Sequence, residues 1–150
     1  MAQVDVGTNN FFWYGKQGEV RLVTDEAVND SDKVLTVPAG YLWQVTFLSV
    51  INATSADVGN RQIVLVARDA EDDVISTIPS LNVQAESTTE YYLFGVSGDV
   101  TETKAGYHFL PLSPLLLPEG YDMRVYDSAA VAAAADDMDV QCQVIQYDNY

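Results

Sequence analysis

The chain is organised around the stretch Pro38-Ala39-Gly40-Tyr41-Leu42-Trp43-Gln44-Val45-Thr46-Phe47-Leu48-Ser49-Val50-Ile51. Its first part is a Pro-x-Gly corner, in which proline presets one backbone dihedral and glycine accepts the positive φ that a tight turn can require. The residues that follow are mostly apolar, β-branched or aromatic, which predicts a long strand. Alternation along that strand predicts one core-facing side. Its expected members are Tyr41, Trp43, Val45, Phe47 and Ile51.

The same corner returns as Pro118-Glu119-Gly120-Tyr121, immediately before a second strand pattern at residues 122–126. Tyr121, Met123 and Val125 share one face of this pattern, so the second strand also has a core side. In both copies the tyrosine after the glycine and every second residue that follows it are expected to face the core. We therefore interpret both corners as structural turns that position two core strands, and not as ligand-binding loops.

Shorter strand patterns fill the rest of the chain. Segment 61–68 is apolar on both faces, which predicts an interior strand paired with the strand at 42–51. Segment 128–135 is rich in alanine but short for a helix, so we expect one helical turn or an irregular connector. The last strand places Met138, Val140, Cys142 and Val144 on one face. The spacing predicts an all-β fold, a two-sheet β-sandwich that is jelly-roll-like and has no long helix.

At 150 residues the chain fits one domain, which we place at residues 19–150, behind an N-terminal aromatic arm or peripheral strand at residues 1–18. Four adjacent large rings in this arm cannot all face one core, because alternation sends two each way. They either cap one end of the chain's own sandwich or anchor a neighbouring subunit, since aromatic residues are enriched at interface centres. The candidate partner-binding residues are therefore Phe11, Phe12, Trp13 and Tyr14.

The charge balance is strongly acidic, with 22 acidic and 7 basic residues and a formal net charge of −15. Binding to a phosphate backbone or to an anionic membrane depends on clustered Lys and Arg, so we expect neither nucleic acid nor membrane as a direct partner. No apolar run approaches the roughly 20 residues that span a bilayer. The acidity either keeps an exposed β surface soluble or complements a basic partner.

No catalytic constellation stands out. His108 is the single histidine and sits in a strand pattern, which favours a structural residue over a general base. Cys142 is the single cysteine and falls on the apolar face of the last strand, where a thiol behaves as a small hydrophobe. We therefore expect no enzymatic activity, no catalytic residue and no cofactor.

Two acidic clusters offer oxygen atoms that calcium could use. Neither matches an EF-hand loop, which requires glycine at its sixth position, and most acidic turns are only solvated, so we predict no metal site. The clusters are Asp69, Glu71, Asp72 and Asp73 in one turn, and Asp136, Asp137 and Asp139 near the last strand.

Four segments carry a resemblance to a known family. They are Leu35-Thr36-Val37-Pro38-Ala39-Gly40-Tyr41, Gly59-Asn60-Arg61, Leu115-Leu116-Leu117-Pro118-Glu119-Gly120-Tyr121 and Asp136-Asp137-Met138. Together they resemble small virion proteins of tailed bacteriophages, over roughly residues 33–147. The resemblance implies a jelly-roll or related β-sandwich decoration (cement) protein, made in the bacterial host cytoplasm and placed on the outer capsid surface of the virion. It implies the major capsid protein as partner, leaves self-association open, and brings no catalytic residues.

A second hypothesis is a virion or tail-associated module that presents aromatic side chains to a carbohydrate or a host surface. Its candidates are Trp13, Trp43, Tyr91 and Tyr92, although the alternation explains Trp43 better as core.

Overall fold

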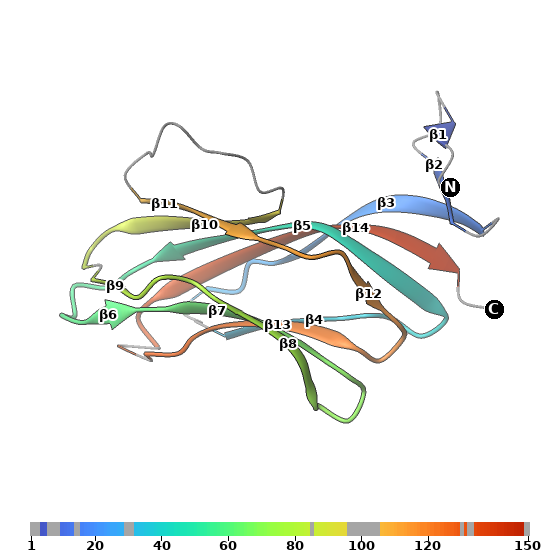
Figure 1. The fold of residues 1–150 in the computed structure, drawn as a ribbon. Coiled ribbons are helices and arrows are strands. Elements are labelled where there is room, and N and C mark those ends of the chain that lie inside the picture. Colours follow the sequence, from blue (N-terminus) through green and yellow to red (C-terminus); the bar gives the residue numbers. More distant parts are fainter. Residues whose placement is uncertain are drawn as a thin grey trace.

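The computed structural model describes residues 4–5, 10–13, 16–28, 32–84, 86–95, 106–129, 131 and 134–148, with the backbone alone at 4–5, 10–13 and 16. Over these residues the chain forms strands joined by turns and contains no helix. It follows that none of the described segments is a helix with the length and apolar character needed to cross a membrane. The strands form two stacked sheets (Figure 1), which confirms the predicted all-β two-sheet sandwich.

The larger sheet contains β1 (Val4–Asp5), β2 (Asn10–Trp13), β3 (Lys16–Asp25), β5 (Tyr41–Ala53), β10 (Thr89–Gly95), β11 (Tyr107–Pro111), β12 (Leu115–Leu117) and β14 (Asp137–Asp148). Its order is β1-β2-β3-β14-β5-β10-β11, and β12 shares one edge of β5 with β10. Neighbouring strands are antiparallel, except that β10 and β11 run parallel. The edge position of β11 agrees with the constraint that its proline imposes, since proline cannot donate to a ladder.

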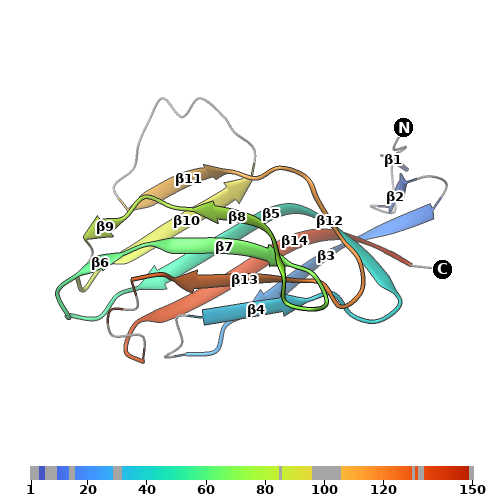
Figure 2. The same ribbon diagram turned by 60° about the horizontal axis from the view of Figure 1, so that its bottom comes forward.

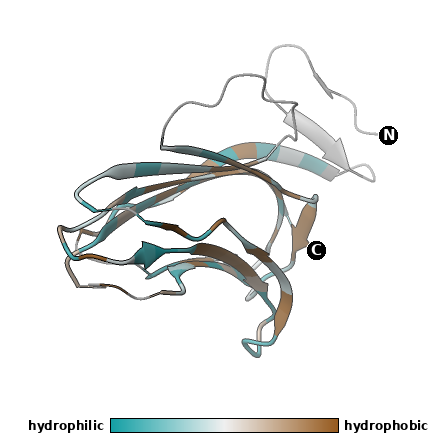
Figure 3. Ribbon diagram, turned by 60° about the vertical axis from the view of Figure 1, so that its left-hand side comes forward, coloured by the Kyte–Doolittle hydropathy of each residue, from teal (hydrophilic) through white to brown (hydrophobic). Residues whose placement is uncertain are grey.

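The smaller sheet contains β4 (Asp32–Thr36), β13 (Asp122–Asp127), β7 (Ile63–Arg68) and β8 (Val74–Pro79) in that order, all antiparallel (Figure 2). A separate two-stranded ribbon pairs β6 (Asn60–Arg61) with β9 (Val83–Gln84). Hydrophobic residues gather in the strands of both sheets, and the turns at the ends of the sandwich are mostly hydrophilic (Figure 3).

The core lies between the two sheets. Val140, Cys142 and Val144 of β14 share one buried cluster with Met123 and Val125 of β13, and all five side chains are fully buried. This confirms the inward faces predicted for the last strand and for the strand after the second corner. Burying each such side chain stabilises the fold by about 1.5–3 kcal/mol.

Both Pro-x-Gly corners are turns with a left-handed glycine: φ is +81° at Gly40 and +80° at Gly120. Each closes with a hydrogen bond from the tyrosine N–H to the proline carbonyl, of 3.3 Å at Tyr41 and 3.2 Å at Tyr121. The corners also lie side by side. The Val37 N–H donates to the Tyr121 carbonyl at 2.8 Å, and the Gly120 N–H donates to the Val37 carbonyl at 3.1 Å. The two corners are therefore hydrogen-bonded to each other, and together they position the starts of β5 and β13.

The predicted inward face of β5 is correct only as far as Val45. The pairing with β14 shifts between Gln143 and Val144, which leaves Thr46 as an extra residue, a β-bulge, in β5. Beyond the bulge the parity inverts, so Leu48 and Val50 are fully buried, whereas Phe47 is 37% exposed. Ile51, also expected inside, is only partly buried because it points to the same side as Phe47.

The interior strand predicted at 61–68 is found over residues 63–68 as β7, whereas Arg61 belongs to β6 and pairs with β9. The partner predicted for the interior strand was wrong. β7 lies between β13 and β8 in the smaller sheet and makes no ladder with β5. Both sheets have an apolar inner face, so an apolar strand fits either one. The sequence pattern therefore does not distinguish a strand that is hydrogen-bonded to β5 from one that packs against it across the core. In the connector before β14, the described residues 128, 129, 131, 134 and 135 form turns.

Candidate interaction surfaces

The aromatic residues 11–13 lie in β2, the second strand from one edge of the larger sheet, where β1 is the outermost strand. β2 pairs with β1 and with the start of β3, where Phe12 is opposite Gln17, and Phe11 and Trp13 are opposite Gly18 and Lys16. Neighbouring positions of β2 therefore continue opposite faces of the sheet. The structure does not describe Tyr14, and it describes only the backbone of Phe11, Phe12 and Trp13. The partner-binding role of these four residues remains a prediction.

The outer face of the larger sheet, turned away from the smaller one, carries apolar side chains in contact with solvent. Phe47, Phe109 and Leu116 are 37%, 49% and 44% exposed, and we call these three residues the apolar ridge. Phe47 lies over Gly95, where an added Cβ would come within 2.6 Å of its ring. Nearby on the same face, the rings of Tyr91 and Tyr107 stack with centroids 4.5 Å apart.

A groove of about 520 Å³ opens where β10 and β12 leave a gap along β5. It reaches the bulged Thr46 and is bordered by Gly95 and by the turn from Pro111 to Pro114. The sequence held no signal for the groove at Thr46 or for the outward position of Phe47, because both depend on the bulge. Strict alternation would have turned Phe47 inward.

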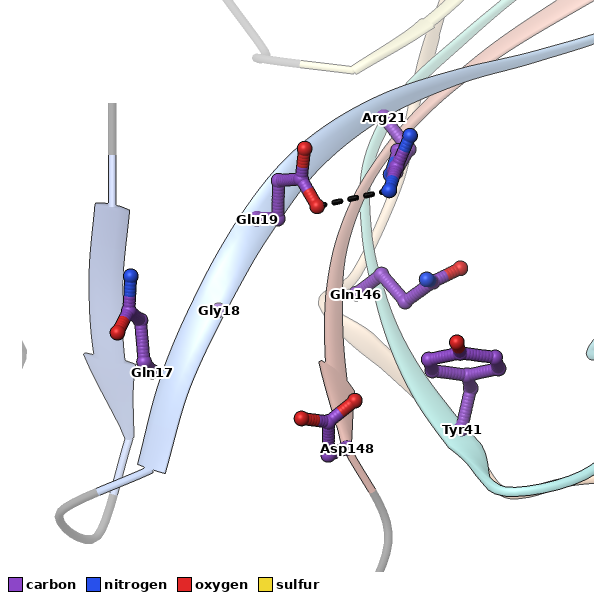
Figure 4. A pocket seen from close by; sticks show the side chains of 7 residues that line it. All are labelled: Gln17, Gly18, Glu19, Arg21, Tyr41, Gln146 and Asp148. Carbon is purple, nitrogen blue, oxygen red and sulfur yellow. Dashed lines mark hydrogen bonds and ion pairs between the residues drawn. The ribbon is translucent and has the colours of Figure 1, made fainter. Parts of the chain in front are cut away.

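A second hollow, of about 320 Å³, lies at the start of β5, over the paired strands β3 and β14 (Figure 4). We call it the polar concavity. It is lined by Gln17, Glu19 and Arg21 of β3, Tyr41 of β5, and Gln146 and Asp148 of β14. The Arg21 Nη2 atom lies 2.8 Å from Glu19 Oε2. Gly18 lies beneath it, and an added Cβ there would come within 2.5 Å of the Tyr147 ring.

All five cationic side chains within the described part of the chain are ion-paired with carboxylates. The pairs are Arg21 with Glu19, Lys33 with Asp25, Arg61 with Asp136, Arg68 with Asp72 and Asp122, and Arg124 with Asp32. The side chain of Lys16 and all of Lys104 lie outside that part. An anionic ligand would have to compete with these internal carboxylates for each described cation.

Arg61 of β6 and Asp136, which directly precedes β14, form a buried ion pair that also binds the loop after β5. Arg61 Nε is 2.9 Å from Asp136 Oδ2, and its Nη1 donates to the carbonyls of Asp57 and Gly59 at 2.8 and 3.0 Å. The Ser55 N–H donates to Asp136 Oδ1 at 2.7 Å. Burial alone would raise the pKa of Asp136, but hydrogen bonds from Arg61 and Ser55 outweigh it and lower that pKa. The hydrogen bond to Asp136 raises the pKa of Arg61.

In the acidic turn between β7 and β8, Asp69 and Asp72 use their carboxylates internally. Asp69 Oδ1 accepts from the N–H groups of Glu71 and Asp73 at 3.0 and 2.8 Å, and Asp72 Oδ1 lies 3.0 Å from Arg68 Nη1. Among the described residues, no three or more His, Cys, Asp or Glu side chains are grouped so that they could hold a metal ion.

His108 and Cys142 occupy structural environments. His108 Nε2 is 2.8 Å from Glu90 Oε2, and its ring stacks on Tyr92 with centroids 4.6 Å apart. Burial raises the pKa of the Cys142 thiol to about 12, so it stays protonated near neutrality. Of the aromatic residues considered for carbohydrate binding, Trp43 is 2% exposed and Tyr92 is fully buried. Neither can present a ring to a ligand, and Tyr91 is partly covered by Tyr107.

Comparison with known proteins gives little further guidance. No family model and no curated protein sequence matches the chain. A chain in the structure of infectious bursal disease virus, Gx strain, is similar over 98% of this chain and 41% of its own length, with 10% identity and a TM-score of 0.34. The present chain thus spans about two fifths of that one.

Proposed function

We propose that this chain is a non-enzymatic structural protein of a tailed bacteriophage that decorates the outer capsid and stabilises it by bridging major capsid subunits. The observation that carries the proposal is the apolar ridge, Phe47, Phe109 and Leu116, held solvent-exposed on the outer face of the larger sheet. β1 and β2 rise from the same side of the larger sheet, away from the smaller one (Figure 1). Two separate contact regions on one side are what a bridging protein needs.

The energetics of such a role are multivalent. A ridge of three side chains and a short aromatic strand supply individually modest contacts, but many copies on a symmetric shell act together. A formal net charge of −15 keeps the free protein and the decorated particle dispersed. It also favours a basic or neutral capsid surface as the partner.

The test is co-sedimentation of the purified protein with phage heads that lack it. We expect wild type to bind. A Phe47→Ser/Phe109→Ser variant should bind at least about tenfold more weakly, because central apolar anchors dominate interface energies. The matched control is Val74→Ser/Ile75→Ser, which removes residues of β8 that are 60% and 51% exposed in the smaller sheet. This control should bind like wild type.

Removing residues 1–15, which leaves β3 whole, tests the arm separately. Weaker binding is expected if Phe11 to Tyr14 contact a second subunit, and unchanged binding would rule out the anchor role. Failure of the intact protein to sediment with heads would contradict the proposed function itself.

A further inference from the structure

We propose that the polar concavity is a binding site for a neutral saccharide. Tyr41 supplies an aromatic platform, and Gln17 and Gln146 supply amide groups. This inference does not rest on the proposed function, because the concavity lies on the inner face of the larger sheet and the apolar ridge lies on the outer face.

The strand register explains why a polar hollow forms here. Across β3, β14 and β5, Val144 is opposite Arg21 and Val45, Gln146 is opposite Glu19 and Trp43, and Asp148 is opposite Tyr41. Successive rows on one face are about 7 Å apart. The face therefore changes from a row with two buried valines, through a mixed row, to a row in which Tyr41 is partly buried and Asp148 is exposed.

Gln146 is the fixed element of the site. Its Oε1 accepts a hydrogen bond of 3.0 Å from the indole Nε1 of Trp43, which is 2% exposed. Because an indole N–H can only donate, this contact determines which end of the amide is oxygen. The Nε2 group must then point away from Trp43, and no other described residue accepts from it. A preoriented donor therefore lines the concavity beside the Tyr41 ring (Figure 4).

The charges of the concavity favour a neutral ligand. The Arg21 guanidinium is matched by Glu19 at 2.8 Å, so it is a weak anchor for an anion. The two amides and the phenol of Tyr41 can donate to and accept from hydroxyl groups. An aromatic ring can cover the apolar C–H face of a sugar ring while its polar edge stays hydrated. A volume of about 320 Å³ falls at the small end of ligand sites and suits one or two sugar units.

The test begins with wild-type protein on a printed array of bacterial and mammalian glycans, followed by NMR titration with the oligosaccharide that binds best. The decisive variant is Gln146→Glu, which keeps an oxygen for Trp43 Nε1 but removes the amide donor. We expect binding to weaken at least about fivefold, as loss of one hydrogen bond implies, with the melting temperature little changed. Gln17→Ala should also weaken binding.

The matched control is Gln143→Glu. Gln143 is an exposed glutamine on the opposite face of β14, and its Oε1 also accepts a hydrogen bond, from Thr46 Oγ1 at 3.3 Å. This variant should bind the oligosaccharide like wild type. The inference is overturned if no glycan binds, if Gln143→Glu weakens binding as much as Gln146→Glu, or if Gln146→Glu leaves the affinity unchanged. A preference for a lysine-rich peptide over every glycan would equally overturn it, and none of these outcomes bears on binding to phage heads.

Discussion

Glu119 connects the two Pro-x-Gly corners, because its Oε2 accepts a hydrogen bond of 2.7 Å from the backbone N–H of Gly40. The carboxylate comes from the middle of the second corner and satisfies the left-handed glycine of the first. With the backbone bonds of Val37 to Tyr121 and Gly120, three hydrogen bonds join turns that are far apart in sequence. The repeat in the sequence is therefore one structural unit at the end of the sandwich.

Glu119→Ala should lower the free energy of unfolding by about 1 kcal/mol, because a hydrogen bond to a charged acceptor is lost. Urea unfolding gives the difference. Glu71→Ala is the matched control, since Glu71 is also an exposed glutamate in a turn and its carboxylate has no partner among the described residues. A loss of equal size in Glu71→Ala would attribute the effect to net charge and contradict the role of the cross-corner bond.

Gly18→Ala should cost more stability than Gly40→Ala. At Gly18 a Cβ would lie 2.5 Å from Tyr147 Cε1 and 2.6 Å from Ile145 Cγ2, and the Tyr147 ring is fixed because its hydroxyl bonds Gln44. Overpacking of this kind costs about 1–3 kcal/mol or more. At Gly40 nothing lies within 4 Å, so only the left-handed backbone, about 1 kcal/mol, opposes alanine. The order of thermal melting temperatures, with Gly18→Ala the lower, checks this.

Arg61→Met should destabilise the protein by about 3–5 kcal/mol, because it leaves the buried Asp136 carboxylate without its guanidinium partner. The control is Arg124→Met, whose partner Asp32 lies 2.6 Å away but whose ion pair is exposed to solvent. That change should cost about 0–1 kcal/mol. Guanidinium chloride unfolding of both variants separates the two environments. Similar losses would show that burial does not distinguish the two ion pairs.

Asp136 also predicts a pH dependence. Its pKa in the folded protein is lowered, so its charged form stabilises the fold at pH values above the unfolded pKa of about 3.9. That contribution is lost as the pH falls through the folded value. Asp136→Asn should therefore be less stable than wild type at pH 7, and the gap should narrow below about pH 4. Urea midpoints measured from pH 7 to pH 3 test the sign; a constant gap would contradict it.

The sequence was sufficient for the fold class and for half of the central strand. Alternation assigned Tyr41, Trp43 and Val45 to the inner side correctly, because residues two apart share a face while the ladder is regular. It failed after Thr46, since a bulge is defined by the opposing strand, here at Gln143 and Val144, and no local pattern reports it. The outward position of Phe47 in the apolar ridge and the groove beside β12 were missed for the same reason.

The polar concavity was missed for a different reason. Its six lining side chains come from three segments that are distant in the sequence, and each has an ordinary role when considered alone. Only the pairing of β14 with both β3 and β5 brings Gln146 and Tyr41 to one face beside Arg21. In contrast, the aromatic arm was visible in the sequence because its four residues are contiguous.

If Thr46 is an extra residue in β5, the strand should tolerate its deletion. Deleting Thr46 places Phe47 directly after Val45, so strict alternation sends Val45 inward, Phe47 outward and Leu48 inward, as in the native fold. The deletion variant should therefore fold, with a loss of about 1 kcal/mol for the hydrogen bond of 2.9 Å from the Thr46 hydroxyl to the Gln143 carbonyl.

The control is deletion of Ser49, which would turn the fully buried Val50 and Asn52 to the outer face and should abolish folding. Near-ultraviolet circular dichroism and proton NMR dispersion distinguish the two outcomes. If both deletions unfolded the protein, the bulge would be an indispensable part of the ladder, and if both folded, the inward parity of β5 would not be what holds the sheets together.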